Sequence, residues 1–360
     1  MKNKSIILII VIALIIISII LLQKTKPIKN EKPEINKISI QDNSERVKIK
    51  LDKYSRAIEL VEPNGYLNTD NITISENIGK KVILVDFWTY TCINCQRTIP
   101  YLNSWYEKYK DKGLVIIGVH TPEFDFEKDY SNVQKAIEKY NIKYPVVQDN
   151  EYKTWTAFNN RFWPRKYLID IDGFIVYDHI GEGSYKETEE KILELLKERN
   201  QVLNLNLNFD SNLENQEQEI NQINFGLTPE IYFGYSYSRN QIGNKEGWIP
   251  NEIVTYKIPE KIDNDKFYLS GEWLNNVDNM ELKGNFGSIL LKYSAKEVNI
   301  VAGSEKPIEI TIFIDGKETK KLEISDNTLY NIVSSSKSET HTLRIEVSEP
   351  GIKAYTFTFG

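Results

Sequence analysis

The only two cysteines of the 360-residue chain, Cys92 and Cys95, lie two residues apart in the segment DFWTYTCINCQRTIP, residues 86–100. They follow a continuous apolar run at 81–88, typical of a strand buried on both faces of a sheet, and they precede a helical pattern at 94–112. At the start of a helix, free backbone N–H groups and the helix dipole stabilise a thiolate. The spacing therefore predicts that Cys92 is a nucleophile and that Cys95 resolves the mixed disulfide it forms.

A metal site and a structural disulfide are the alternatives for this pair. Zinc normally needs four protein ligands, and the three histidines are scattered along the chain, at His120, His179 and His341. A disulfide between residues so close in sequence closes almost no loop and would stabilise little. The pair is therefore interpreted as a redox-active dithiol, with no metal and no cofactor expected. The uncharged residues between the cysteines favour a reductant or isomerase over a strong oxidant.

Strand and helix patterns alternate around the cysteines, in a region that we place at residues 47–199. The order β-α-β-α-β-β-α predicts an α/β fold with helices on both faces of the sheet. Asp172-Gly173 joins the last two strands as a hairpin. The expected strands are residues 81–88, 113–120, 144–149 and the two hairpin strands, and the expected helices are residues 94–112, 132–140 and 185–199.

The remainder of the chain has a different character. Residues 200–224 are rich in Asn, Gln and Glu and are expected to form a linker. Residues 225–360 contain only short strand patterns broken by Gly, Asn and Asp, with no strong helical stretch. This spacing predicts an antiparallel β-sandwich as the second domain.

The N-terminal residues 5–22 are apolar apart from two serines, and as a helix they would span about 27 Å, enough to cross a bilayer. We expect a single-pass membrane anchor, with a cleaved signal peptide as the alternative. Residues 23–46 are polar, contain Pro27 and Pro33, and are expected to form a tether. Lysines flank the span on both sides, so their distribution does not fix the orientation. An N-terminal signal-anchor would place the rest of the chain outside the cytoplasm.

The charge of the chain excludes one class of partner. The formal net charge is -6 and the sequence pI is about 5.5. Such a chain has no general attraction to phosphate backbones, so we expect no nucleic acid partner.

The segment VDFWTYTCINC followed by Pro100 resembles the signature of thioredoxins, with Asp86 six residues before Cys92. The longer pattern, with GVHTPEF at 118–124, VVQDN at 146–150 and TWTAFNNRFWPRKYLID at 154–170, is similar to the extracytoplasmic part of DipZ-type proteins. In those proteins a TlpA-like thioredoxin domain precedes a β domain that resembles a carbohydrate-binding module. The resemblance extends over residues 59–360.

This resemblance implies a thioredoxin fold, a central mixed sheet flanked by helices, and thiol–disulfide oxidoreductase activity on client proteins that contain disulfides. It leaves open whether those clients belong to cytochrome c biogenesis, repair or folding. Many family members carry a fused electron-conducting membrane domain of the CcdA type. Because this chain has one predicted span, the resemblance implies that a separate CcdA-like membrane partner supplies the electrons.

The resemblance also assigns roles to residues around the dithiol. Pro164 corresponds to the cis proline that faces the dithiol, and it would present the backbone of Trp163 to a substrate strand. Asp86 lies within an apolar run, where a carboxyl group tends to be neutral. It would relay a proton to or from Cys95, although a hydrogen-bonded acid with no catalytic role is the alternative.

Aromatic side chains are expected near the dithiol as well. Trp88, Tyr90 and Trp163 would supply an apolar contact surface for a client, and simple packing explains them about equally well. His120 ends a strand near the same edge, where capping of a loop is the default interpretation and catalysis the alternative.

Two other functions remain open. A thiol peroxidase of the peroxiredoxin class would place a threonine three residues before the nucleophile, as Thr89 is, but that family also has a proline where Val85 stands. A cell-surface binding protein would use the thioredoxin domain only as a scaffold. Six aromatic residues of the second domain could stack on the sugar rings of a glycan, or could simply pack in a spacer or client-docking module: Tyr232, Phe233, Tyr235, Tyr237, Trp248 and Trp273.

Overall fold

A computed structural model describes residues 45–209, 227–237 and 239–360, all of which belong to one compact unit, Lys37–Gly360. Two sheets organise this unit. We refer to residues 45–209 as the α/β region and to the described residues from 227 onward as the β region.

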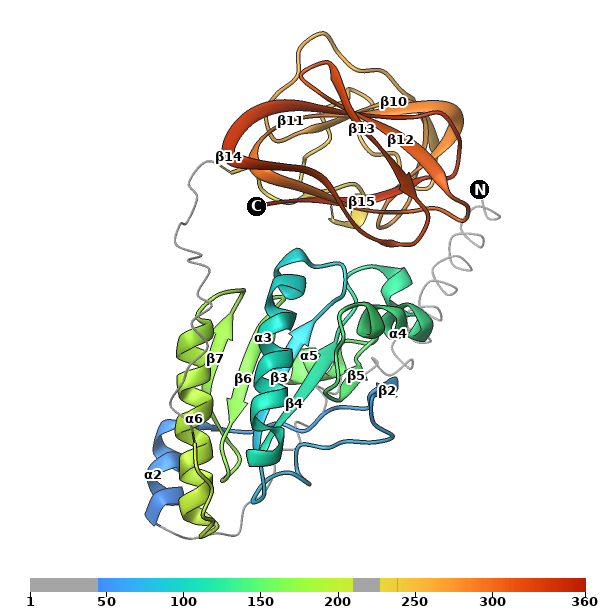
Figure 1. Cartoon of the computed structure of the whole chain (residues 1–360). Coiled ribbons are helices and arrows are strands. Elements are labelled where there is room, and N and C mark those ends of the chain that lie inside the picture. Colours follow the sequence, from blue (N-terminus) through green and yellow to red (C-terminus); the bar gives the residue numbers. More distant parts are fainter. Residues whose placement is uncertain (1–44, 210–226, 238) are drawn as a thin grey trace, which may run out of the picture. The chain divides into compact units, whose positions relative to one another are not determined.

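Seven strands of the α/β region form one mixed sheet in the order β1-β7-β6-β3-β4-β5-β2 (Figure 1). The central strand β3 runs parallel to β4 and antiparallel to β6. All seven side chains of β3 are buried, because both faces of the sheet are covered. The strands are β1 Ser55–Arg56, β2 Gly65–Leu67, β3 Val82–Trp88, β4 Leu114–His120, β5 Val146–Gln148, β6 Arg165–Ile169 and β7 Phe174–Ile180.

Three helices, α3, α4 and α6, pack with one face of the sheet in a single apolar cluster, and α3 and α6 lie side by side there (Figure 1). The opposite face is covered by side chains around α5 and from the segment that precedes β3. The helices are α2 Glu45–Lys53, α3 Ile93–Tyr109, α4 Tyr130–Lys139, α5 Lys153–Ala157 and α6 Tyr185–Val202, with short 3-10 turns at Lys110–Lys112 and Asp125–Lys128.

The elements predicted from the strongest sequence patterns are present in the structure. The buried strand, the three longer helices and the antiparallel hairpin at Asp172-Gly173 are all present, and Gly173 adopts φ 80° in the hairpin turn. The sequence did not predict α2, α5, β1 or β2. Helix α2 begins at Glu45, inside the predicted tether, and its residues Arg46 and Lys50 form ion pairs with Asp172. Because Asp172 is 126 positions from Arg46, no local pattern could have indicated this contact.

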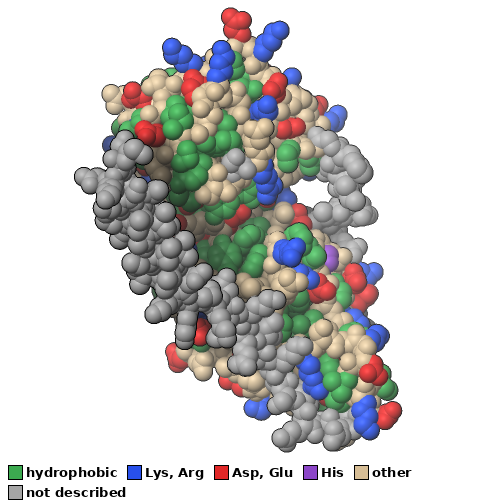
Figure 2. Space-filling model, turned by 180° about the vertical axis from the view of Figure 1, so that it is seen from behind, with side chains coloured by type: hydrophobic (Ala, Val, Ile, Leu, Met, Phe, Trp, Pro, Cys, Tyr) green, Lys and Arg blue, Asp and Glu red, His purple; other side chains and the backbone are tan. Residues whose placement is uncertain are grey.

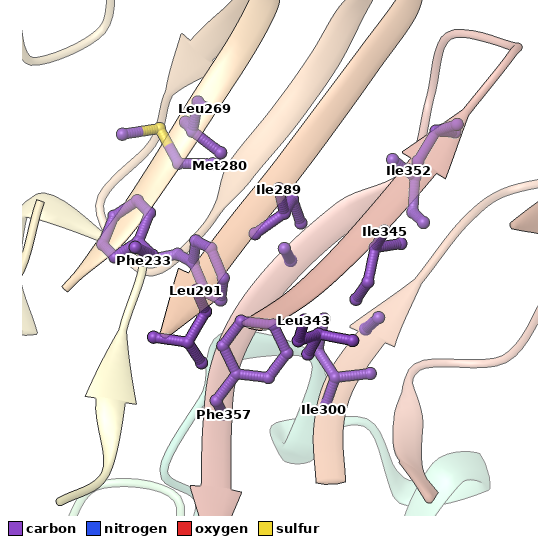
Figure 3. Close-up of a cluster of buried hydrophobic side chains, with 14 of the residues drawn as sticks. Phe233, Leu269, Met280, Ile289, Leu291, Ile300, Leu343, Ile345, Ile352 and Phe357 are labelled. Atoms are coloured by element: carbon purple, nitrogen blue, oxygen red, sulfur yellow. The ribbon is translucent and has the colours of Figure 1, made fainter. Parts of the chain in front are cut away.

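The β region is an antiparallel sheet domain built around two unusually long strands. Strand β11 pairs with β10 along its first half and with β15 along its second half, and it pairs with β14 along both. These pairings join eight strands into one hydrogen-bonded sheet that encloses an apolar core (Figure 3). The strands are β8 Ile231–Tyr232, β9 Ile253–Tyr256, β10 Phe267–Asn275, β11 Met280–Gly303, β12 Ile308–Ile314, β13 Lys317–Ile324, β14 Thr328–Val347 and β15 Lys353–Phe359.

The antiparallel character of this region is confirmed, but the expected run of uniformly short strands is wrong. The departure is clearest at Met280–Gly303, where 24 residues form the single strand β11. Register shifts interrupt the pairing of β11 with its neighbours, which lets one long strand serve both halves of the domain. In the described part of this region the only helical element is a 3-10 turn at Tyr235–Tyr237.

For three of the six aromatic residues that could stack on sugar rings, the structure favours the alternative of packing in the core. Phe233 and Trp273 have no exposed surface, and Trp248 packs against the same core while its indole N–H donates to the carbonyl of Phe233 at 2.7 Å. Core packing therefore accounts for half of the aromatic set, and we do not propose a glycan site on it.

None of the helices within the described residues is long and apolar enough to cross a membrane. The predicted anchor at 5–22 lies outside the described residues, as does the tether up to residue 44 and the predicted linker from residue 210. Helix α6 runs to Val202, so the linker prediction began too early. On the face that Figure 2 shows, acidic and basic side chains are interspersed.

Candidate active site

The dithiol lies where the loop after the central strand β3 leads into helix α3. Cys92 is the N-cap residue of α3, with extended backbone (φ −74°, ψ 117°), and its Sγ accepts a hydrogen bond from the backbone N–H of Cys95 at 3.3 Å. Both cysteines are free thiols, Cys92 half-buried and Cys95 buried. The sulfur of Cys92 therefore lies at the N-terminus of a 17-residue helix, where the first backbone N–H groups have no partner within the helix.

The two thiols differ in environment. Burial raises the pKa of Cys95 well above its usual range, and the neighbouring Cys92 raises it further. Cys95 therefore holds its proton while Cys92 is the sulfur that a reactant can reach. This asymmetry is what a nucleophile followed by a resolving thiol requires.

Asp86 lies in the middle of β3 and is 1% exposed. Burial raises its pKa to about 7, an effect that the charge of Lys166 partly offsets. Among the described residues its Oδ1 has no hydrogen-bond partner. Because side chains alternate along a strand, Asp86 points to the same face as Leu84, which packs in one cluster with Cys95. A carboxyl group whose pKa lies near neutral pH is therefore on the same side of the sheet as Cys95.

Lys166 is a site residue that the sequence did not indicate. It is paired in register with Asp86 across β3 and β6, has no exposed surface, and donates from Nζ to the carbonyl of Gly181 at 3.1 Å. Burial lowers its pKa, whereas Asp86 and Cys95 raise it. The positive charge of Lys166 partly offsets the cost of burying the carboxylate of Asp86. The sequence shows only a strand at this position, and the register that brings the two charges together is set by tertiary pairing.

The peptide bond between Trp163 and Pro164 is cis, and it directly precedes β6. The half-buried Trp163 donates from its indole N–H to the carbonyl of Thr121 at 3.1 Å and lines the same cavity as Cys92. The structure thus brings the dithiol and this segment together, as the resemblance implied. Their roles toward a substrate remain predictions.

Trp88 and Tyr90, the other aromatic residues expected to contact a client, are buried. Trp88 has no exposed surface and sits edge-on to the ring of His120, with centroids 5.1 Å apart, so it has no surface to offer a client. Tyr90 is 4% exposed, stacks on the ring of His120, and donates from its hydroxyl to the carbonyl of Asn327 at 3.3 Å. The prediction of substrate contact is therefore wrong for Trp88, and the buried Tyr90 is committed to internal packing.

His120 is fully buried and contacts the rings of both Trp88 and Tyr90. Burial lowers its pKa to about 3, so it is neutral at physiological pH. A neutral, enclosed imidazole supports the interpretation of a structural histidine rather than an acid or base that exchanges protons with solvent.

Glu127 is a second residue that the sequence did not indicate. Its carboxyl group is fully buried and accepts hydrogen bonds from the hydroxyl of Thr91 at 2.6 Å and from the backbone N–H groups of Glu123 at 2.6 Å and Phe124 at 3.0 Å. These bonds fix the residue immediately before Cys92 to a loop 36 positions away along the chain. Glu127 therefore positions the loop that precedes Cys92 without being part of the motif itself.

Cys92 opens into a cavity of about 410 Å³ whose walls come from both regions. The β region is held there by polar contacts: Tyr232 donates to Glu123 at 2.7 Å, and Arg97 pairs with Glu297 at 2.7 Å. An apolar cluster adds Phe124 from the α/β region to side chains of the β region. The cavity is lined by Thr91, Cys92, Glu123, Tyr152, Arg161, Phe162, Trp163, Glu230, Tyr232, Tyr237, Arg239, Thr356 and Thr358.

Models of two known protein families match the two regions of the chain. The model of the AhpC/TSA family matches residues 55–178, and the model of the thioredoxin-like C-terminal domain matches residues 228–360. The thiol–disulfide oxidoreductase ResA of Bacillus thuringiensis is 32% identical over 128 residues, which cover 33% of this chain and 71% of ResA. A solved thioredoxin-like protein in its oxidized form is 26% identical and covers 40% of this chain and 97% of its own, with a TM-score of 0.38.

A longer match is the protein DipZ of Mycobacterium bovis, 35% identical over 312 residues. The match covers 86% of this chain but only 44% of DipZ, so the chain spans less than half the length of this relative. A mixed sheet with a dithiol at the start of its first long helix defines the class of thioredoxin-like proteins. The chain belongs to the thioredoxin-like thiol–disulfide oxidoreductases. Its C-terminal β region, residues 228–360, matches the thioredoxin-like C-terminal domain.

Proposed function

We propose that this chain is a membrane-anchored, extracytoplasmic enzyme that reduces or isomerises disulfides of client proteins through Cys92 and Cys95. The observation that carries the proposal is the asymmetry of the two thiols. One is reachable at a helix N-terminus and the other is buried within one helical turn of it. The names of the relatives support the same activity, since ResA is called a thiol–disulfide oxidoreductase.

The mechanism uses this asymmetry in two steps. The thiolate of Cys92 attacks one sulfur of the client disulfide, which forms a mixed disulfide and expels the other client sulfur, and that sulfur takes up a proton. Cys95 then loses its proton to Asp86 and attacks the Sγ of Cys92, so that the client leaves with its second sulfur reduced. Two electrons pass from the dithiol to the client. The enzyme is left with a Cys92–Cys95 disulfide.

Restoring the dithiol needs two electrons from outside the chain. We propose a CcdA-like membrane protein as the donor, on the basis of the resemblance to DipZ-type proteins. The residues between the cysteines, Ile93 and Asn94, are uncharged, which favours net reduction or isomerisation over oxidation of clients. The Trp163 backbone before the cis proline is proposed to hold the client strand.

The activity is tested by insulin reduction with the full chain and a chemical reductant. Because Cys92 is the attacking sulfur, we expect steady turnover in the wild type and a loss of at least about a hundredfold in Cys92→Ser. Hydrogen peroxide consumption is measured in parallel, because the AhpC/TSA match and Thr89 make a peroxidase the second candidate. Rapid peroxide consumption without insulin reduction would overturn the proposal in favour of a peroxidase. A cellular phenotype that survives Cys92→Ser would instead point to a scaffold for the β domain.

The anchor is tested by fractionation. Residues 5–22 are apolar enough to span a bilayer, so the full chain should stay in the membrane pellet after alkaline carbonate extraction. A variant that lacks residues 5–22 should be released. A full chain that is extracted as readily as the truncated variant would argue for a cleaved segment instead. Labelling of Cys92 by a membrane-impermeant thiol reagent on intact cells checks the extracytoplasmic location.

A further inference from the structure

The cavity at Cys92 is small for a site that must meet a protein. Its volume of about 410 Å³ lies in the range of small-molecule pockets. A rigid protein surface would instead need an open, gently curved face around the sulfur. The space at Cys92 admits a few residues of a flexible chain.

The β region supplies the wall that narrows this space. The hydroxyl of Tyr232 donates to the carboxyl group of Glu123, and the hydroxyl of Tyr237 donates to the backbone carbonyl of the same residue at 2.6 Å. Both tyrosines line the cavity, as do Thr356 and Thr358 of β15. Since these side chains line the same cavity as Cys92, a client that enters it contacts side chains of both regions.

The acidic side chains that line the cavity have hydrogen-bond partners, whereas in the described part of the chain its arginine side chains do not. Arg161 and Arg239 are exposed at its wall, and within the described residues neither guanidinium forms an ion pair or a hydrogen bond, although Arg239 lies 5.0 Å from the ring of Tyr232. Two carboxyl groups, Glu123 and Glu230, share the hydroxyl of Tyr232. Burial and the neighbouring carboxylates raise the pKa of Glu123 to about 8, so Glu123 is mostly protonated at neutral pH. The lining then has two cations against one anion.

An unsatisfied polar atom points to a ligand independently of these charges. Thr358 is 6% exposed and lines the cavity, yet among the described residues its buried Oγ1 has no hydrogen-bond partner. Buried hydroxyls are nearly always hydrogen-bonded, so a backbone group of a bound chain is a fitting partner.

We propose that the cavity selects, as the client of the proposed disulfide exchange, an extended chain segment whose cysteine is flanked by acidic residues. The guanidinium groups of Arg161 and Arg239, which form no ion pair within the described residues, bind carboxylates of the segment in the cavity, since a guanidinium and a carboxylate form charge-assisted hydrogen bonds. The aromatic walls contact the segment's apolar atoms, and the β region excludes folded surfaces. The inference rests on the proposed function and specifies its substrate.

The test uses the full chain, reduced and in detergent, with short synthetic peptides that each contain one intramolecular disulfide. The peptides have equal length and differ only in the residues next to the cysteines, which are Asp, Ser or Lys. Single-turnover reduction is followed by stopped-flow tryptophan fluorescence. We expect the acidic peptide to react about fivefold or more faster than the basic one, because each guanidinium contributes modestly at an exposed site.

Matched variants locate the effect. In Arg161→Gln/Arg239→Gln the ratio of acidic to basic rates should fall toward one, whereas Arg161→Lys/Arg239→Lys should retain most of it. Lys306→Gln, which removes an exposed charge of the β region that does not line the cavity, should leave the ratio as in the wild type. Thermal melts confirm that each variant is folded.

Two results would overturn the inference alone: a wild-type ratio near or below one that the glutamine variants do not change, or a folded protein disulfide reduced as fast as the acidic peptide. If Cys92 is alkylated normally but no peptide is reduced, then the proposed function itself fails.

Discussion

A full chain with Cys95→Ser is expected to accumulate client proteins covalently bound to Cys92. The first step of the exchange needs only the thiolate at the helix N-terminus, and the second needs the buried sulfur that this substitution removes. Multiple turnover should fall on the order of a thousandfold, as when one member of a catalytic pair is removed. The adducts are detected as higher bands on non-reducing gels and identified by mass spectrometry after reduction.

The matched control is Cys92→Ser, which should form no adducts although it retains Cys95. Cys95 is buried and holds its proton, so it should not substitute for the missing nucleophile. If Cys92→Ser trapped as many clients as Cys95→Ser, the order of attack would be reversed. If Cys95→Ser turned over within tenfold of the wild type, an external thiol would be resolving the intermediate instead. The identity of the trapped clients would show whether they are cytochromes, repair substrates or folding proteins.

The second large effect concerns Asp86→Asn and depends on pH. Burial raises the pKa of Asp86 from 3.8 to about 7, so the folded state favours the neutral acid. Wild-type stability therefore declines as pH rises from about 4 through about 7, by about 4 kcal/mol for a shift of this size. Asparagine cannot ionise. The free energy of unfolding of Asp86→Asn should thus rise relative to the wild type over this range, as urea melts at pH 4, 6 and 8 would measure.

The same substitution should slow the chemistry. If Asp86 accepts the proton of Cys95, the rate of the resolving step should rise with pH through about 7 in the wild type, and Asp86→Asn should lose this limb. Lys166→Met is the companion variant: without the buried cation the pKa of Asp86 rises further, so the midpoint should move to higher pH. Rapid quench of the mixed disulfide across pH 5–9 gives the profile. Identical profiles in all three proteins would show that Asp86 only fills space.

The shared environment of Asp86 and Lys166 explains why both are needed. Each is a charged side chain with almost no exposed surface, and a buried charge without its partner is strongly unfavourable. The charge of Lys166 thus lowers the free-energy cost of keeping the carboxyl group of Asp86 buried on the same side of the sheet as Cys95. Loss of Lys166 should therefore also destabilise the protein at pH 8, where Asp86 is ionised, more than at pH 5, where it is neutral.

Short-range signals in the sequence determined the centre of this protein. The β-branched run of β3 predicted a fully buried strand, and the cysteines directly after it predicted a helix N-terminus with Cys92 outermost. Asp172-Gly173 predicted the hairpin of β6 and β7. Each of these features depends on residues within a few positions of one another, where propensity, capping and turn chemistry act directly.

Only the tertiary structure decided which distant residues complete the site. Lys166 is paired with Asp86 by strand register, Glu127 fixes Thr91 from 36 positions away, and Tyr232, from a different sheet, lines the same cavity as Cys92. The tertiary structure also decided between client contact and simple packing for Trp88, which lies inside the core. Hydrophobic periodicity indicates which residues of one helix or strand share a face, but it does not indicate which helices and strands pack against one another. Register and packing between elements arise from the whole fold, which is why the dithiol could be found in the sequence and its surroundings could not.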